Sequence, residues 1–176
     1  MKLNHSLCAC TLTAALAIAP TTVMAASNVA ENMMKDASAA SARICDDAQA
    51  LSMAAPDSSL SHQGEAARLA SIKLSVQQIS EDVAHLNLWS NLESTPEQKA
   101  VRESNPLLKS LAEETTGAIQ FLNDHNASTL FQPEYREHLQ RISQDASQIR
   151  ALFRESTRLN ALSHKAAHLR EQLSHS

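Results

Sequence analysis

A seam of apolar residues in the stretch 69–86 constrains the fold of this chain more than any other feature. Aliphatic residues recur there at alternating spacings of three and four, with polar residues between them: Leu69, Ile72, Val76, Ile79, Val83 and Leu86. This is the a/d pattern of a helix that packs along one face against other helices, as in a coiled coil. One helix cannot bury such a stripe by itself, so the rest of the chain must supply the other walls of a bundle.

The composition of the 176-residue chain agrees with a helical fold. It has only two glycines and five aromatic residues, whereas sheets are rich in aromatic and β-branched side chains. So few glycines also argue against phosphate-binding loops, which need several of them close together. The length suits one domain with a substantial core.

The N-terminus has the pattern of a signal peptide. Lys2 makes the start weakly positive, the run 7–20 is mostly apolar, and small residues suited to cleavage precede Ala26. The apolar run is too short to span a bilayer, and no later stretch replaces it as a transmembrane anchor. We therefore expect residues 1–25 to be removed, leaving one helical-bundle domain over 26–176 that is secreted into a bacterial periplasm.

The charge balance argues against a nucleic-acid partner. The chain has 15 Lys and Arg, and loss of Lys2 leaves 14 against 19 Asp and Glu, a net charge of −5. Binding to a phosphate backbone needs clustered basic residues, whereas the arginines of the C-terminal third are interspersed with acids.

Cys45 is expected to be the only cysteine of the mature chain, since Cys8 and Cys10 leave with the signal peptide. No internal disulfide can then form. Because Cys45 follows Ile44 on an apolar flank, we expect it to be buried or partly buried rather than to cross-link two chains.

Capping and breaking residues divide the chain into four predicted helices. The first covers 27–54, and the second, which carries the seam, runs to about Leu92. Thr95-Pro96-Glu97-Gln98 is a capping box that begins the third helix, and Pro133 opens the last one. Short connections make consecutive helices antiparallel neighbours. The prediction is an all-α, up-down-up-down four-helix bundle with long second and fourth helices.

Periodicity also predicts which side chains of the other helices face the core. The first helix contributes Val29, Met33, Ala37, Ala40, Ile44, Ala48 and Leu51. The third contributes Val101, Leu108, Leu111, Ile119 and Leu122, with a kink or short break at Pro106. The last contributes Tyr135, Leu139, Ile142, Ala146, Ile149 and Leu152, and continues as Leu159, Leu162, Ala166, Leu169 and Leu173.

A histidine stripe near the C-terminus is the strongest candidate for chemistry. His164, His168, Glu171 and His175 follow one another at intervals of four, three and four residues. At 100° per residue they fall within about 60° of one helix face, so two or three of them can hold one Zn, Cu or Ni ion. The predicted core leucines of this helix lie about 140–200° from His164, so the histidines should face solvent, where a two-ligand site is weak. A plain polar helix face is the simpler interpretation of the same residues.

Two short resemblances bear on ligands. Met33 or Met34, following Glu31-Asn32, together with a C-terminal histidine resembles the haem ligand pair of four-helix b-type cytochromes, which implies a haem-binding bundle. A haem ligand must point into the bundle, however, and His164 and His168 are predicted to point outward. Separately, Thr95-Pro96-Glu97-Gln98 is similar to the Leu-Thr-x-x-Gln motif of periplasmic stress chaperones and metal sensors related to Spy, although it lacks the leading Leu.

The sequence contains no familiar enzyme signature: no nucleophile elbow, no His-Glu-x-x-His, no phosphate loop and no Cys-x-x-Cys-His. The function we expect is therefore a non-enzymatic structural or protein-interaction module, whose partner is a second copy or another protein. Leu88 and Trp89, opposite the seam, are candidates for an interface. The alternative is a periplasmic metal-binding or metal-stress protein that uses the histidine stripe, and the third hypothesis is a haem-binding bundle.

Overall fold

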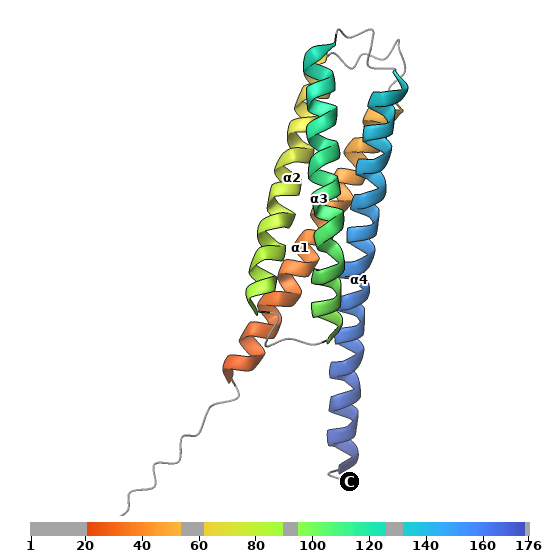
Figure 1. Cartoon of the computed structure of the whole chain (residues 1–176). Coiled ribbons are helices and arrows are strands. Elements are labelled where there is room, and N and C mark those ends of the chain that lie inside the picture. The colour runs from red at the N-terminus through yellow and green to blue at the C-terminus, as the bar shows by residue number, and fades with distance from the viewer. Residues whose placement is uncertain (1–20, 54–61, 90–94, 126–131, 175–176) are drawn as a thin grey trace, which may run out of the picture.

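Four helices packed against one another make up the part of the chain that the computed structural model describes, residues 21–53, 62–89, 95–125 and 132–174 (Figure 1). They are α1 (Thr21–Ser52), α2 (His62–Trp89), α3 (Thr95–Asp124) and α4 (Pro133–Ser174). No strand occurs among these residues, so the all-helical prediction is confirmed. Most of the predicted signal peptide lies outside the described residues, as do the side chains of 21–27, 89 and 95.

The predicted seam of α2 is confirmed. All six of its aliphatic side chains are buried, and the most exposed of them, Val76, retains 5% of its surface. Leu88 is exposed on the opposite side, as its position predicts. The spacing of the apolar residues alone was enough to predict which face of α2 is buried, because the other helices cover the apolar face and leave the polar face to solvent.

Polar contacts tie each helix to its neighbours. Arg68 of α2 pairs with Asp47 of α1, with 3.2 Å between Nη1 and Oδ1. Between α3 and α4, His138 Nδ1 donates to Glu114 Oε2 at 2.6 Å. The Asn160 side-chain amide also donates to Glu97, near the start of α3. The start of α3 therefore lies beside residue 160 of α4.

The core face of α1 differs from the prediction at its N-terminal end. Met34 and Ala30 are fully buried, whereas Met33 is only partly buried and Val29 is exposed. The predicted residues from Ala37 onward are all buried. Met34 and Ala30 precede Ala37 by three and seven residues, so they lie on the same face of the helix. The predicted positions, Met33 and Val29, were each one residue out of phase.

The helix α3 runs continuously through Pro106, so the predicted short break is wrong. Pro106 has no N–H to donate to the backbone carbonyl one turn before it. Because Pro106 lies on the exposed face, this carbonyl can bind water instead, which lowers the cost of a proline inside a helix. Four of the five predicted core residues of α3 are buried, and Ile119 is partly buried.

The core face of α4 agrees with the prediction only as far as Ile149. Beyond it, Phe153 is fully buried and Leu152 only partly. Ser156 and Asn160 then take the core positions, while the predicted core leucines are on the surface. These leucines are exposed because α3 begins beside residue 160, so nothing in α3 is left to cover them.

Candidate functional site

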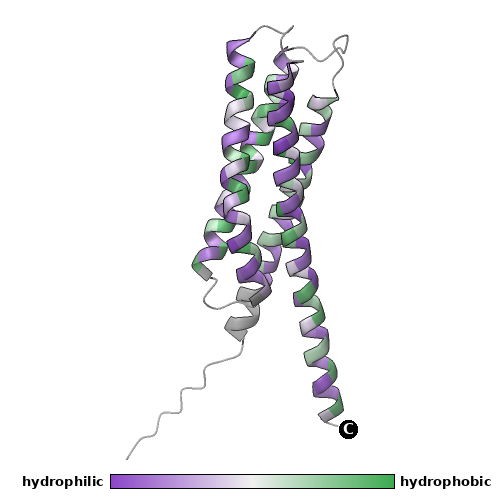
Figure 2. Ribbon diagram, turned by 45° about the vertical axis from the view of Figure 1, so that its right-hand side comes forward, coloured by the Kyte–Doolittle hydropathy of each residue, from purple (hydrophilic) through white to green (hydrophobic). Residues whose placement is uncertain are grey.

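The C-terminal end of α4, Ala161–Ser174, extends beyond its neighbours, and we call it the bare end. Every side chain in it is exposed. Both ribbon views show it continuing past α3 and diverging from the N-terminal end of α1 (Figures 1 and 2). The helix nevertheless continues without interruption to Ser174.

Large apolar side chains line one face of the bare end and of the turn before it. We call them the leucine stripe: Leu159 (37% exposed), Leu162 (52%), Leu169 (50%) and Leu173 (78%). Figure 2 shows these apolar positions alternating with polar ones along the protruding helix. Their spacing of three, seven and four residues places them on one side of the helix.

The leucine stripe does not continue the core of the bundle. The core face of α4 passes through Phe153, Ser156 and Asn160. Leu152 and Leu159 each precede a core position by one residue, so the stripe is rotated by about 100° around the helix. Where the core face ends it is polar: Asn160 is paired with Glu97, and the buried Ser156 hydroxyl has no hydrogen-bond partner. The core therefore closes at residue 160, and the stripe is a separate surface.

The charged residues that flank the leucine stripe are basic. Arg158 and Lys165 lie on one side and Arg170 on the other. Arg158 pairs with Glu155, with 2.8 Å between Nη2 and Oε1. Lys165 and Arg170 make no ion pair within the described part of the chain. The stripe is thus apolar with a positive border.

The histidine stripe lies on the bare end as well. His164, His168 and Glu171 are exposed, whereas His175 is outside the described residues. We predicted that the histidines face solvent because the leucines of this helix were placed in the core. That reason is wrong, since these leucines are exposed as well. Within the described ranges no three His, Cys, Asp or Glu side chains are grouped so that they could hold a metal ion.

The residues considered for haem are not brought together inside the bundle. Met34 is buried and Met33 partly buried, while His164 and His168 lie on the surface of the bare end.

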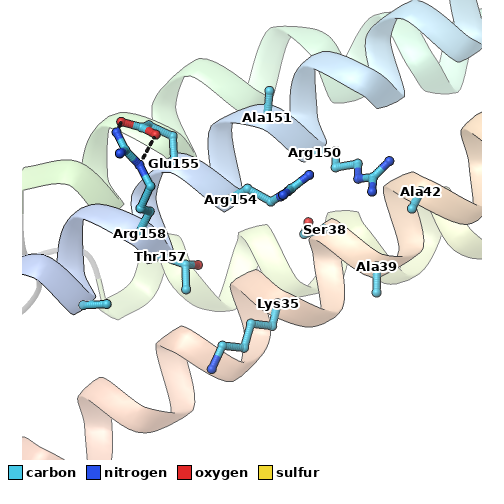
Figure 3. A pocket seen from close by; sticks show the side chains of 11 residues that line it. Lys35, Ser38, Ala39, Ala42, Arg150, Ala151, Arg154, Glu155, Thr157 and Arg158 are labelled. Carbon is cyan, nitrogen blue, oxygen red and sulfur yellow. Dashed lines mark hydrogen bonds and ion pairs between the residues drawn. The ribbon is translucent and has the colours of Figure 1, made fainter.

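A groove between α1 and α4 was not anticipated from the sequence. Its volume is about 770 Å³, and we call it the basic groove because Lys35, Arg150, Arg154 and Arg158 line it. Glu155 is the one acidic residue in its lining, which also contains small side chains from both helices (Figure 3). The signal that could have found it is the spacing of four residues between successive arginines, which places them on adjacent turns of one face.

Cys45 is buried, as predicted, and its thiol donates to the backbone carbonyl of Ser143, with 3.4 Å between Sγ and O. Burial raises the pKa of the thiol, and the smaller opposing effect of the Arg150 charge does not offset this. A buried cysteine kept in the thiol form packs like a small apolar residue.

At the opposite end of the bundle, two buried polar groups have no hydrogen-bond partner within the described part of the chain. The Glu65 side chain is buried and its Oε2 makes no hydrogen bond; burial raises the pKa of this carboxyl, against a smaller lowering by His62. The Tyr135 hydroxyl is also unpaired, and burial, with the nearby Glu65 charge, raises its pKa. The Tyr135 ring stacks on Phe121 at a centroid distance of 5.6 Å.

Comparison with protein-family models, with curated proteins and with solved structures finds no match to this chain. None of the described helices combines the length and apolarity that a membrane crossing requires.

Proposed function

We propose that this chain is a secreted, non-enzymatic protein-interaction module. In this proposal it is an up-down-up-down bundle, freed of its signal peptide over 1–25, that binds another protein through the leucine stripe. The observation that supports the proposal most directly is that four leucines on one face of α4 are exposed, where this helix extends beyond its neighbours. Contiguous exposed apolar surface with a polar border is typical of interaction sites.

Charge favours an acidic helix of a different protein over a second copy as the occupant. In a heptad with the stripe at a and d, Arg158 and Lys165 occupy g positions and Arg170 an e position. Two parallel copies would set Lys165 of one against Arg170 of the other, and two antiparallel copies would set Lys165 against Lys165. Like charges across such a seam disfavour pairing, whereas an amphipathic helix with Glu or Asp at its flanks would neutralise Lys165 and Arg170.

Two synthetic helical peptides test this proposal. Both carry leucine at a and d; one has Glu at e and g, and the other has Lys. We expect the Glu peptide to bind the full chain at least about tenfold more tightly, measured by fluorescence anisotropy at about 50 mM salt. Leu162→Gln with Leu169→Gln should abolish this binding.

A matched control uses exposed leucines elsewhere. Leu74 (67% exposed) and Leu88 (75% exposed) lie on α2, and their double Gln variant should bind as the unchanged chain does. Equal binding of the two peptides, or loss of binding in the α2 variant, would contradict the proposal. Two other results would also contradict the proposal. One is a dimer in sedimentation velocity, and the other is adsorption to vesicles of zwitterionic and anionic phospholipid, in each case if Leu162→Gln with Leu169→Gln removes it.

We also propose a second function, transition-metal binding by His164 and His168, because both are exposed one turn apart on a continuous helix. Titration of the untagged protein with Zn²⁺ should give a dissociation constant in the micromolar range or below, and His164→Ala with His168→Ala should abolish binding. His85→Ala is the control, because His85 is an exposed histidine on α2. Unchanged affinity in the double variant would exclude this site.

Native mass spectrometry of the protein purified from a periplasm, without a histidine tag, tests the remaining parts of the proposal in one spectrum. The expected mass is that of residues 26–176 as a monomer. A mass that retains residues 1–25 would contradict processing, and an added haem mass would favour the haem-binding hypothesis instead.

A further inference from the structure

The basic groove is open, and two of its cationic side chains extend into it. Figure 3 shows Arg150 and Arg154 extending from α4 into the space between α4 and α1, near the small side chains of Ser38 and Ala42. The small residues in its lining come from both helices: Ser38, Ala39, Ala42, Ala151 and Ala161. Because these side chains are short, the space between the two helices is left free beneath the arginines.

The charges in the groove are only partly compensated. Lys35 pairs with Glu31 at 2.6 Å (Nζ to Oε1), and Arg158 binds both carboxylate oxygens of Glu155. Arg150 and Arg154 make no ion pair or hydrogen bond within the described part of the chain. Two neighbouring uncompensated guanidinium groups thus face a groove in a chain whose net charge is −4.

We infer that the basic groove binds an elongated anion carrying at least two phosphate or sulfate groups. Arg150 and Arg154 are one helical turn apart, about 6 Å along the axis, so each can take one anionic group. A guanidinium donates two parallel hydrogen bonds to the oxygens of such a group. The Ser38 hydroxyl makes no hydrogen bond within the described part of the chain and adds a donor on the α1 side. The groove, with a volume of about 770 Å³, has room for more than one phosphate or sulfate group.

Calorimetric titration with tripolyphosphate, with inorganic phosphate and with a sulfated trisaccharide tests this inference on the full chain. We expect a multiply charged probe to bind at least about tenfold more tightly than inorganic phosphate, and to weaken between about 50 and 200 mM salt. Whether tripolyphosphate or the sulfated sugar binds more tightly identifies the source of the anionic groups.

Three variants separate a site from diffuse charge. Arg150→Gln with Arg154→Gln should weaken binding at least tenfold. Ala42→Leu keeps every charge but adds bulk on the α1 side of the groove, and should also weaken binding. Arg102→Gln removes an exposed arginine of α3 that does not line the groove, and should change the affinity less than twofold.

Loss of affinity in Arg102→Gln equal to that in the groove variants would overturn the inference, as would full binding by Ala42→Leu or equal binding of phosphate and tripolyphosphate. The inference does not depend on the leucine stripe. The Leu162→Gln, Leu169→Gln variant should bind these probes normally, so failure of one proposal leaves the other standing.

Discussion

The two halves of α4 have similar apolar periodicity and opposite surroundings. In residues 133–160 the apolar face is covered by the other helices, and the largest side chains, Tyr135 and Phe153, are fully buried. In the bare end the leucines repeat just as regularly and are all exposed. A heptad-like pattern therefore shows that a helix has an apolar face suited to packing. Whether that face is buried depends on how far the neighbouring helices extend.

The most severe test of this comparison is a pair of truncations on one helix. Phe153→Ala removes a fully buried ring and should lower the free energy of unfolding by about 3–5 kcal/mol. Leu169→Ala removes an exposed side chain and should change it by less than about 0.5 kcal/mol. Urea denaturation followed by circular dichroism measures both. A large loss of stability in Leu169→Ala would mean that the bare end is covered in solution.

A second test concerns charge in the covered part of the bundle. Because burial raises the folded-state pKa of Glu65 above its usual value of 4.5, its ionised form destabilises the fold at neutral pH. This penalty is complete above the raised folded pKa and disappears as the pH falls through 4.5. Glu65→Gln should thus stabilise the protein by about 1 kcal/mol at pH 8 and by almost nothing at pH 4. A stabilisation that does not vary with pH would contradict this origin.

A third test uses the close approach of Gly117 in α3 to His138 in α4. A Cβ at Gly117 would lie 2.6 Å from His138 Cε1, so Gly117→Ala must displace the ring that donates to Glu114. Loss of that charge-assisted bond should outweigh the better helix propensity of alanine, for a net destabilisation of about 1 kcal/mol. In a His138→Ala background the same change should stabilise by about 1 kcal/mol. Thermal unfolding of the four proteins measures this change of sign, and stabilisation in both backgrounds would contradict it.

The smallest expected effect comes from removing the bare end. Ending the chain after Ala161 keeps the Asn160 bond to Glu97, and every described residue that it deletes, 162–174, is exposed. The free energy of unfolding should change by less than about 0.5 kcal/mol, while binding of the Glu peptide should be lost. A truncated protein that unfolds readily would show that the bare end stabilises the bundle.

Much of the local structure could be predicted from residue spacing alone. The seam of α2, the capping box at Thr95 and the burial of Cys45 follow from patterns of a few turns, and the structure agrees with the helix start and with both burial predictions. The errors arose where one pattern was extended beyond its evidence. Met33 was placed in the core in place of Met34, and the regular leucines of α4 were read as a continuation of the bundle.

The amino-acid sequence by itself determined that this chain forms four helices and which face of α2 is buried, because hydrophobic periodicity is a local property. Only the tertiary structure decided that the core closes at Asn160, that the leucine stripe is a separate surface, and that Arg150 and Arg154 face α1 across an open groove. These facts depend on where other helices end and how they cross. No spacing within α4 encodes the length or the tilt of α1 and α3.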